Sequence, residues 1–271
     1  MGARRANEVL VVGLVVASTG CKAPPEAPTE LNELSAYLFR NYEAEDDRVL
    51  PLGLANLYEF FEDVDLDVKY GDRSYSLTPL TEDDIDVPHP DRDLSLAMPI
   101  AQVVASEFTP EEHATVMVLE DQTMVEPASP EQYTREFLDP EDPTCFLTRD
   151  CPVIRTLCDI RKQNAIMDLP YLMHKDFQWV EMGEPGSEEW AILARAWVED
   201  HVEGSGGDVH MHQSFSIDVF LRDGDDGVIR YLALWTEVEI PGVGDSSIAG
   251  TTKYGMHKMF KATDDYLEDN L

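Results

Sequence analysis

Two alternating segments near the C-terminus constrain the fold more than any other feature of the chain. Apolar side chains occupy every second position over much of residues 209–221, and the same period recurs over residues 228–240. Successive side chains of a strand point to opposite faces, so each pattern predicts a strand with one buried face. The intervening sequence RDGDDG at 222–227 contains Asp-Gly twice, which favours a tight connection. We therefore expect an antiparallel hairpin here.

The segments around this hairpin predict an α+β fold. Residues 177–182 and 190–198 are further strand candidates, and Thr252 to Asn270 repeats apolar residues at the helical period. The expected architecture is an antiparallel sheet with a long C-terminal helix packed on it. Helices segregated to the faces of an antiparallel sheet are typical of this class.

The N-terminal half predicts mainly helices. Residues 29–64 contain two amphipathic patterns that favour a helical hairpin, and the apolar run Leu94–Ser106 predicts a buried helix. We expect a helical region at 29–110, followed by the α+β domain at 111–271.

Two elements are expected between these parts of the chain. Ala114–Leu119 is apolar and partly β-branched, which predicts a strand. Ser129 followed by Pro130 is typical of a helix start, and Pro140 would end the short helix that begins there.

The beginning of the chain has the layout of an export signal. Arg4 and Arg5 precede an uninterrupted apolar run, Val9 to Ala17, and small residues then lead directly to Cys21. The run is shorter than the about 20 residues that a transmembrane helix needs. Small residues ending in Cys resemble the lipobox of bacterial lipoproteins. The resemblance implies a signal peptide at 1–20 and lipid modification of Cys21; an ordinary cleaved signal with a chance Cys is the alternative.

A lipidated N-terminus would determine where the protein acts. Residues 21–28 form a Pro-rich tether, and attached acyl chains would hold the exported protein on a membrane. We expect it in the bacterial cell envelope, lipid-anchored to a membrane and facing the periplasm or the outside. The lipobox, KAPPEAP at 22–28 and the Trp-containing strands together resemble lipoproteins of myxobacterial type, a likeness that implies no particular activity.

The charge of the chain excludes one class of partner. It has 20 Lys and Arg against 54 Asp and Glu, a net charge of −34. Such a field repels phosphates, so nucleic-acid binding is excluded, and electrostatic docking to anionic lipid is disfavoured. We expect a solvated acidic coat; binding of cations or basic partners is the alternative.

Cys145 and Cys151 are expected to form a disulfide. They flank a short loop bounded by Pro143 and Pro152, and an exported chain folds in an oxidising compartment. The sequence does not decide whether Cys158 is free.

No catalytic motif is present, so no catalytic residue and no cofactor is assigned. G-x-S-x-G, H-E-x-x-H, the Walker pattern and G-x-G-x-x-G are all missing from the sequence. His210 and His212 are the best metal candidate, because residues two apart share one face of a strand. A first-row metal normally requires three or more ligands, and the third is not identified. Two solvent-facing histidines are the alternative.

The order of elements from about residue 114 resembles a known family. The expected order is a strand, a short helix, several antiparallel strands and a long C-terminal helix. This order is similar to that of the START-like helix-grip superfamily, and the most similar stretch is VEPASPEQYTREFLDPE (Val125–Glu141), with its helix start at Ser-Pro. In that superfamily a curved sheet wraps the terminal helix, which implies a cavity for an apolar or lipid-like ligand. The lining implied here is Trp197, Phe215, Ile217, Trp235, Met256, Met259 and Phe260. The same residues would also suit a filled core.

Three functional hypotheses follow. The first is a non-enzymatic, membrane-anchored lipoprotein that binds an apolar or lipid-like ligand between the sheet and the C-terminal helix. The second is a structural or protein-interaction lipoprotein without a ligand cavity. The third is a metal-dependent hydrolase built around His210 and His212.

Overall fold

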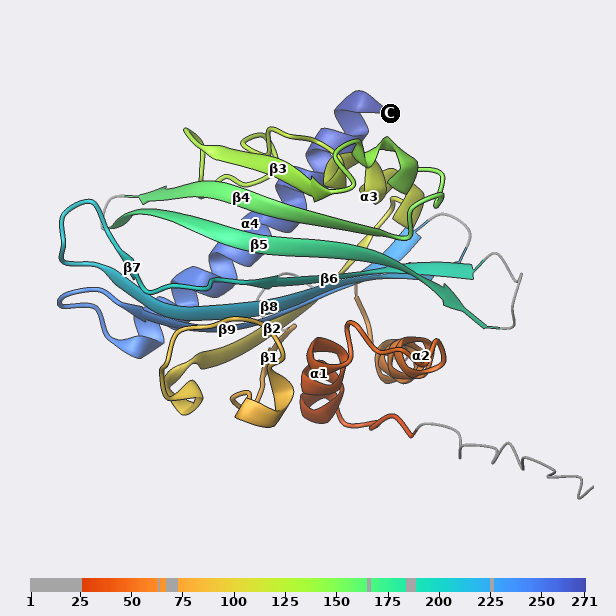
Figure 1. Ribbon diagram of the computed structural model, residues 1–271, viewed down its shortest axis with the longest axis horizontal. Helices are drawn as coiled ribbons and strands as arrows, with labels where there is room; N and C mark the ends of the chain where they lie inside the picture. The colour runs from red at the N-terminus through yellow and green to blue at the C-terminus, as the bar shows by residue number, and fades with distance from the viewer. Residues whose placement is uncertain (1–25, 63, 67–72, 165–166, 184–188, 225–226) are drawn as a thin grey trace, which may run out of the picture.

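The computed structural model describes residues 26–62, 64–66, 73–164, 167–183, 189–224 and 227–271 (Figure 1). Cys21 and the expected signal peptide lie outside the described residues. The helices are α1 Leu31–Arg40, α2 Val49–Glu62, α3 Pro110–Met117 and α4 Asp245–Asn270, with short 3-10 turns η1 Glu82–Asp84, η2 Leu94–Leu96 and η3 Pro143–Phe146. The strands are β1 Ser74–Ser76, β2 Met98–Ser106, β3 Tyr133–Asp139, β4 Val153–Asn164, β5 Met167–Met182, β6 Glu189–Trp197, β7 Val202–Glu203, β8 His210–Asp223 and β9 Gly227–Glu239.

Within the described residues, the nine strands form one antiparallel sheet. Its order is β1-β2-β9-β8-β6-β5-β4-β3, and β7 pairs with β8 beside this path. The hairpin expected from the alternating segments is confirmed: β8 pairs with β9 from His210 opposite Glu239 to Asp223 opposite Gly227. Residues 177–182 lie in β5 and residues 190–197 lie in β6, which also confirms the strands expected at 177–182 and 190–198.

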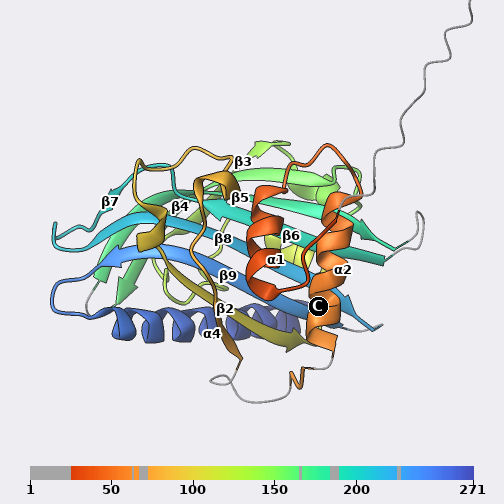
Figure 2. The same cartoon turned by 90° about the horizontal axis from the view of Figure 1, so that it is seen from below.

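The C-terminal helix α4 lies across one side of the sheet, which we call the α4 face (Figures 1 and 2). Met256 and Phe260 of the helix pack on Ile100 of β2 and Leu232 of β9. The expected antiparallel sheet with a long C-terminal helix is thus confirmed, although α4 begins before the expected start at Thr252. The buried residues of this 26-residue helix are Ile248, Met256, Phe260, Thr263 and Leu267. A narrow stripe therefore holds the helix on the sheet.

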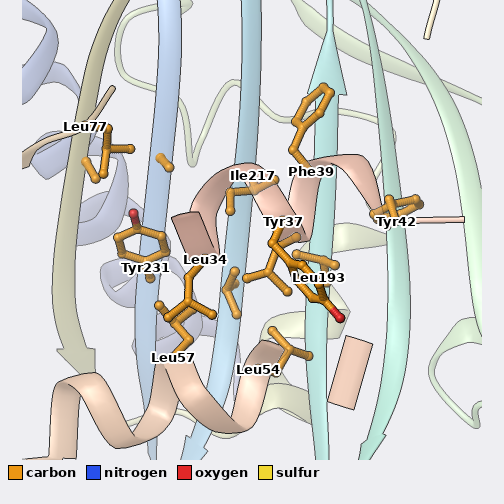
Figure 3. Packing of buried hydrophobic residues seen from close by; sticks show 14 of the residues in the cluster. Leu34, Tyr37, Phe39, Tyr42, Leu54, Leu57, Leu77, Leu193, Ile217 and Tyr231 are labelled. Atoms are coloured by element: carbon orange, nitrogen blue, oxygen red, sulfur yellow. The ribbon is translucent and has the colours of Figure 1, made fainter. Parts of the chain in front are cut away.

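The N-terminal helices cover the opposite side, the α1/α2 face (Figure 2). Figure 3 shows side chains of α1 and α2, including Leu34, Phe39 and Leu54, against the strands that carry Ile217 and Tyr231. The Ser35 hydroxyl donates to the Leu31 carbonyl, so its oxygen accepts from the buried Tyr231 hydroxyl at 2.6 Å. The two expected N-terminal helices are confirmed, and they share one core with the sheet.

The expected buried helix at Leu94–Ser106 is wrong, because Met98–Ser106 is strand β2. Its side chains alternate between the faces: Ala101 and Val103 pack in the α1/α2 core, whereas Ile100 packs under α4. Both faces of the strand are covered, so its sequence is apolar throughout and lacks a visible period of two. The region expected to be helical, 29–110, therefore also contributes β1 and β2 to the sheet.

The expected strand at Ala114–Leu119 is also wrong, because α3 spans Pro110–Met117. The helix start lies just before that segment: Thr109 and Glu112 form a reciprocal capping box, and Pro110 occupies the first turn. This arrangement satisfies free backbone N–H groups and favours the helix over the β-branched content that follows.

The Ser129-Pro130 signal does not start a helix, although it carried part of the family resemblance. Residues Tyr133–Asp139 form strand β3 at the edge of the sheet, paired with β4. Tyr133 and Arg135 are buried, while Thr134 and Glu136 are exposed. Pairing with β4 and this alternation outweigh the local helix signal.

The structure joins Cys145 and Cys151 by a disulfide, as expected, and Cys158 is a free, buried thiol. Among the described residues, no helix combines the length and the apolar character needed to cross a membrane.

Candidate functional site

A small cavity lies between the sheet, α3 and α4, where the family resemblance implied one. Its volume is about 50 Å³. The apolar part of its wall consists of Val116, Met117, Val125, Phe177, Phe220 and Met259. Small-molecule sites usually measure about 300–1,000 Å³, so this space matches a headgroup rather than a whole lipid.

The remaining wall is polar and includes five charged side chains. Three cations, Arg135, Lys175 and Arg230, and two carboxylates, Glu126 and Asp218, line the cavity, which leaves a net charge of +1. The chain as a whole carries −34. The cavity is therefore positively charged, although the protein as a whole is strongly negative.

Arg230 and Asp218 form the central ion pair of the cavity. Arg230 Nε and Nη2 donate to the two oxygens of Asp218 at 3.1 and 2.8 Å, and both side chains are buried. Lys175 Nζ lies 3.9 Å from the same carboxylate. Burial lowers the pKa of Lys175, and Asp218 opposes that shift. One carboxylate therefore faces two cations, the buried Arg230 and the partly buried Lys175.

Arg135 has no carboxylate partner in the part of the chain that the structure describes. It is 5% exposed, and its guanidinium stacks 4.8 Å above the Phe177 ring and donates to the Met117 carbonyl. Among the described residues no carboxylate lies within ion-pair distance of Arg135, and its Nε has no hydrogen-bond partner. A buried cation without a counterion is costly, so this group favours an anionic ligand.

His113 contributes no charge to the cavity at neutral pH. Burial, reinforced by Arg230, lowers the pKa of His113 to about 3. The Ser106 hydroxyl donates to Asp264 at 2.8 Å, so its oxygen accepts from His113 Nε2 at 3.1 Å. The neutral imidazole therefore presents its lone pair at Nδ1.

The seven residues expected to line one cavity are divided between the two faces. Met259 lines the cavity of the α4 face, while Met256 and Phe260 pack beside it between α4 and the sheet. Phe215, Ile217, Trp235 and Trp197 lie on the α1/α2 face and belong to its core. The expected common lining is therefore wrong for these four residues, because their side of each strand faces α1 and α2.

Sequence reasoning missed the charged residues that line the cavity. Asp218 of β8 stands between Ile217 and Val219, and Arg230 of β9 stands between Ile229 and Tyr231, so each charged residue has an apolar neighbour on either side in its strand. A charged residue at an inward position of such a strand is a usable signal, since it must find a partner when buried.

A second cavity, of about 270 Å³, lies on the α1/α2 face. Its lining is Glu43, Asp86, Val87, Pro88, Leu138, Arg155, His174, Asp176, Arg195 and Trp197. Arg195 binds Asp86 at 2.6 Å and lies 3.6 Å from Glu43, and Arg155 lies 3.9 Å from Asp176. Carboxylates thus balance both arginines, so this cavity has no unpaired charge that would select an anion.

Asp176 should make stability depend on pH. Burial raises its pKa to about 6, despite the opposing charges of Arg195 and Arg155. The folded state then retains a proton that the unfolded state releases, so stability falls as pH rises from about 4 to 6. The side chain of Asn does not ionise, so the Asp176→Asn variant avoids the cost of a buried carboxylate. It should be more stable than the parent by about 1–3 kcal/mol above pH 6, with little difference at pH 4.

Urea denaturation at several pH values checks this difference. Asp159→Asn, on the exposed side of β4, controls for loss of one negative charge from the acidic coat. A gain in stability that is the same at pH 4 and pH 7 would contradict the assigned role of Asp176.

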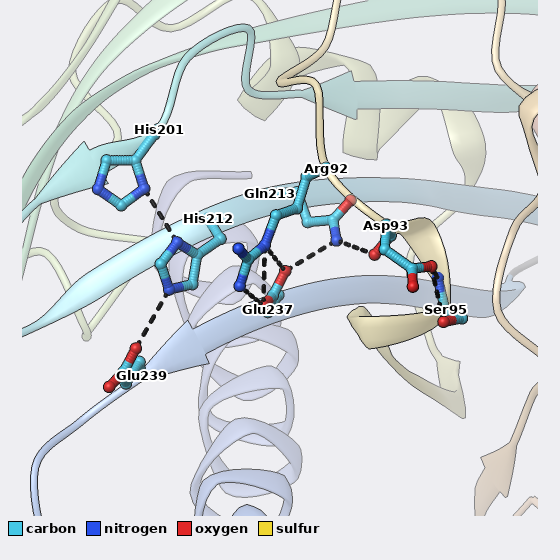
Figure 4. Close-up of polar contacts among 8 residues, drawn as sticks. All are labelled: Arg92, Asp93, Ser95, His201, His212, Gln213, Glu237 and Glu239. Atoms are coloured by element: carbon cyan, nitrogen blue, oxygen red, sulfur yellow. Dashed lines mark hydrogen bonds and ion pairs between the residues drawn. The ribbon is translucent and has the colours of Figure 1, made fainter.

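His210 and His212 lie on β8, and their rings stack 5.8 Å apart, in agreement with the expected shared side. The structure brings His201 beside both rings. Figure 4 shows His212 between His201 and Glu239. These groups lie far along the strands from the charged cavity of the α4 face.

No protein-family model and no curated protein sequence matches the chain. A START superfamily protein from Mycobacterium smegmatis matches with 12% identity over 64% of this chain and 99% of its own, at a TM-score of 0.40. The STAR-related lipid transfer protein from Xanthomonas axonopodis matches with 14% identity over 74% and 97%, at a TM-score of 0.41. Both are START-like proteins, the class that the sequence from residue 114 resembles. Similarity at this level concerns the fold and assigns no ligand.

Proposed function

We propose that the protein is an exported, membrane-anchored binding protein for a lipid-like acid, which it takes up between the sheet and α4. The observation that carries the proposal is Arg135, a buried cation without a carboxylate partner in the described part of the chain. Lys175 adds a second cation, and it shares the Asp218 carboxylate with Arg230. A carboxylate headgroup would supply the missing counterion.

The walls of the cavity support an apolar body behind that headgroup. Met117 and Met259 provide adaptable apolar surface, and Phe177 and Phe220 provide flat ring faces. The volume of about 50 Å³ requires α4 to move when a long chain enters. Gly250 and Gly255 lie within α4, and Gly in a helix interior is less stable than Ala by about 0.5–1 kcal/mol, so the helix can bend most easily at these positions.

The proposal predicts selectivity for the acid headgroup. Oleic acid should bind the full chain at least about tenfold more tightly than oleyl alcohol, since one charge-assisted hydrogen bond contributes about 1.5–3 kcal/mol. Arg135→Gln should remove most of this difference. Native mass spectrometry and competition titration measure both ligands.

Arg48→Gln is the matched control, because Arg48 pairs with Asp46 at the surface. Equal binding of acid and alcohol by the parent would reject the headgroup assignment. No uptake of either ligand would favour the alternative, a structural or protein-interaction lipoprotein without a ligand cavity.

We further propose that Cys21 carries the membrane anchor. Glu26 is the first described residue, and Asn56 of α2 donates to the carbonyls of Ala27 and Pro28 at 3.2 and 2.9 Å. The chain therefore enters the fold beside α2, on the side opposite α4. An anchor there would leave the α4 face away from the point of attachment.

Replacing Cys21 with Ser should move the protein from the membrane fraction to the soluble fraction of a bacterium that processes lipoproteins. Cys158→Ser, which changes a buried thiol in the sheet, is the control and should stay with the membranes. Retention of the Cys21 variant in membranes would contradict lipid anchoring at this residue.

A further inference from the structure

Three histidine rings gather where β7, β8 and β9 meet; we call His201, His210 and His212 the histidine cluster. Ring centroids of His201 lie 4.8 Å from His212 and 5.4 Å from His210. The register of β8 against β9 shifts between Met211 and Gln213, which makes His212 the extra residue of a bulge. Bulges redirect side chains, and this one keeps His212 stacked on His210 and beside His201.

One pair of nitrogens in the cluster has the separation of metal ligands. His201 Nδ1 and His212 Nδ1 are 3.1 Å apart. Two nitrogens that bind one Zn²⁺ at about 2.0–2.1 Å in tetrahedral geometry are about 3.3 Å apart. Without a metal, two Nδ1 lone pairs at this distance would repel, so one of the rings must carry a proton between them.

A carboxylate determines the tautomer of His212. Its Nε2 lies 3.3 Å from a Glu239 oxygen, and a carboxylate only accepts, so Nε2 carries the proton (Figure 4). His212 Nδ1 is then a lone pair directed at His201. An imidazole whose second N–H is held by a carboxylate is the usual arrangement of a metal-binding histidine.

His201 has a matching carboxylate. Its Nε2 lies 4.0 Å from Glu203 of β7. A change of tautomer at His201 would move its proton toward this carboxylate and free Nδ1. Donor atoms of His201, Glu203 and His210 all lie within 4.8 Å of one another.

His210 gives an independent indication of a ligand. Its Nδ1 is buried and has no hydrogen-bond partner among the described residues. A buried polar atom without a partner is costly, and coordination to a metal would remove that cost.

We propose that the histidine cluster binds one divalent first-row transition metal ion, with His201, His210 and His212 as ligands and Glu203 and Glu239 as the carboxylates that orient them. Imidazole ligands suit zinc, copper and nickel rather than calcium or magnesium. The rings lie within 28° of parallel, so binding requires rotation of the side chains; His201, whose side chain is 40% exposed, has room for it. The bound metal would connect the segment before β7 to β8.

The test is a titration of the metal-free full chain with Zn²⁺, followed by calorimetry and by NMR of the imidazole signals. We expect one Zn²⁺ per chain and shifts of the His201, His210 and His212 signals. His201→Ala and His212→Ala should each weaken binding at least tenfold. Glu239→Gln keeps all three imidazoles and should weaken it about tenfold. His174→Ala, which alters a histidine stacked on Trp197, should leave it unchanged.

Two results would overturn the proposal. One is Zn²⁺ binding of equal strength by the parent and by the His201, His210 and His212 triple Ala variant, because the acidic coat alone would then account for uptake. The other is displacement of Zn²⁺ by an equal concentration of Ca²⁺. If the triple variant fails to fold, two measurements still decide the test: the Zn²⁺ affinity of Glu239→Gln, and the shifts of the imidazole signals in the parent. Oleic acid binding should be the same in Glu239→Gln and the parent, since the two sites share no residue.

Discussion

Asp218→Asn should destabilise the fold by about 3–5 kcal/mol, the usual cost of removing one partner of a buried ion pair. The carboxylate accepts two hydrogen bonds from Arg230 and lies 3.9 Å from Lys175. Its loss leaves the buried Arg230 and the partly buried Lys175 without that charge, beside Arg135, which already lacks a carboxylate partner among the described residues. Urea denaturation at neutral pH measures the loss.

A double variant separates the uncompensated charge from a loss of packing. Asp218→Asn combined with Arg230→Met removes both charges and should recover much of the stability, because an apolar replacement of an ion pair is often neutral. Asp265→Asn breaks an exposed pair with Lys261 on α4 and should cost at most about 0.5 kcal/mol. A loss below 1 kcal/mol for Asp218→Asn would show that water reaches the pair.

Phe39→Ala should cost about 3–5 kcal/mol, because the side chain is completely buried and its removal leaves a cavity. The Phe39 ring meets Phe215 and Trp235 edge to face, with centroids 5.9 and 6.3 Å away. These contacts join α1 to β8 and β9, so the variant should lower the stability of helices and sheet together. Unfolding followed by circular dichroism and by tryptophan fluorescence measures both parts.

Leu52→Ala on α2 is the control, since Leu52 is 37% exposed and its truncation should cost far less. Separate transitions for helix and tryptophan signals in the parent would show that α1 and α2 unfold independently of the sheet. That result would restore the expected boundary near residue 110.

The most predictable part of the fold is the hairpin of β8 and β9. Residues 209–221 and 228–240 alternate, and the Asp-Gly turn between them permits a hairpin, so β8 and β9 were predictable. β2 was not, because helices cover both of its sides and its sequence is apolar throughout. The helix predicted at the Ser-Pro segment is wrong for another reason. Residues 133–139 form a strand because β3 pairs with β4, and local sequence propensity does not report such a contact between separate segments.

The candidate sites were predictable to different degrees. His210 and His212 were identifiable because a spacing of two places residues on one side of a strand, but His201 required the fold. The seven residues of the expected ligand lining were assigned through the family resemblance, and four of the seven lie on the other face. Arg135, Lys175, Asp218 and Arg230 were overlooked among many charged residues, since only burial distinguishes them.

A single sheet separates α1 and α2 from α4, so neighbouring residues of one strand contact different structures on its two faces. Ile217 and Val219 of β8 hold the N-terminal helices, while Asp218 and Phe220 between and beside them line the charged cavity. On β5, Asp176 faces one cavity, and Lys175 and Phe177 face the other. The preference for a ligand can therefore diverge in descendants of this chain through substitutions at alternate positions, while the positions between them continue to keep the scaffold folded.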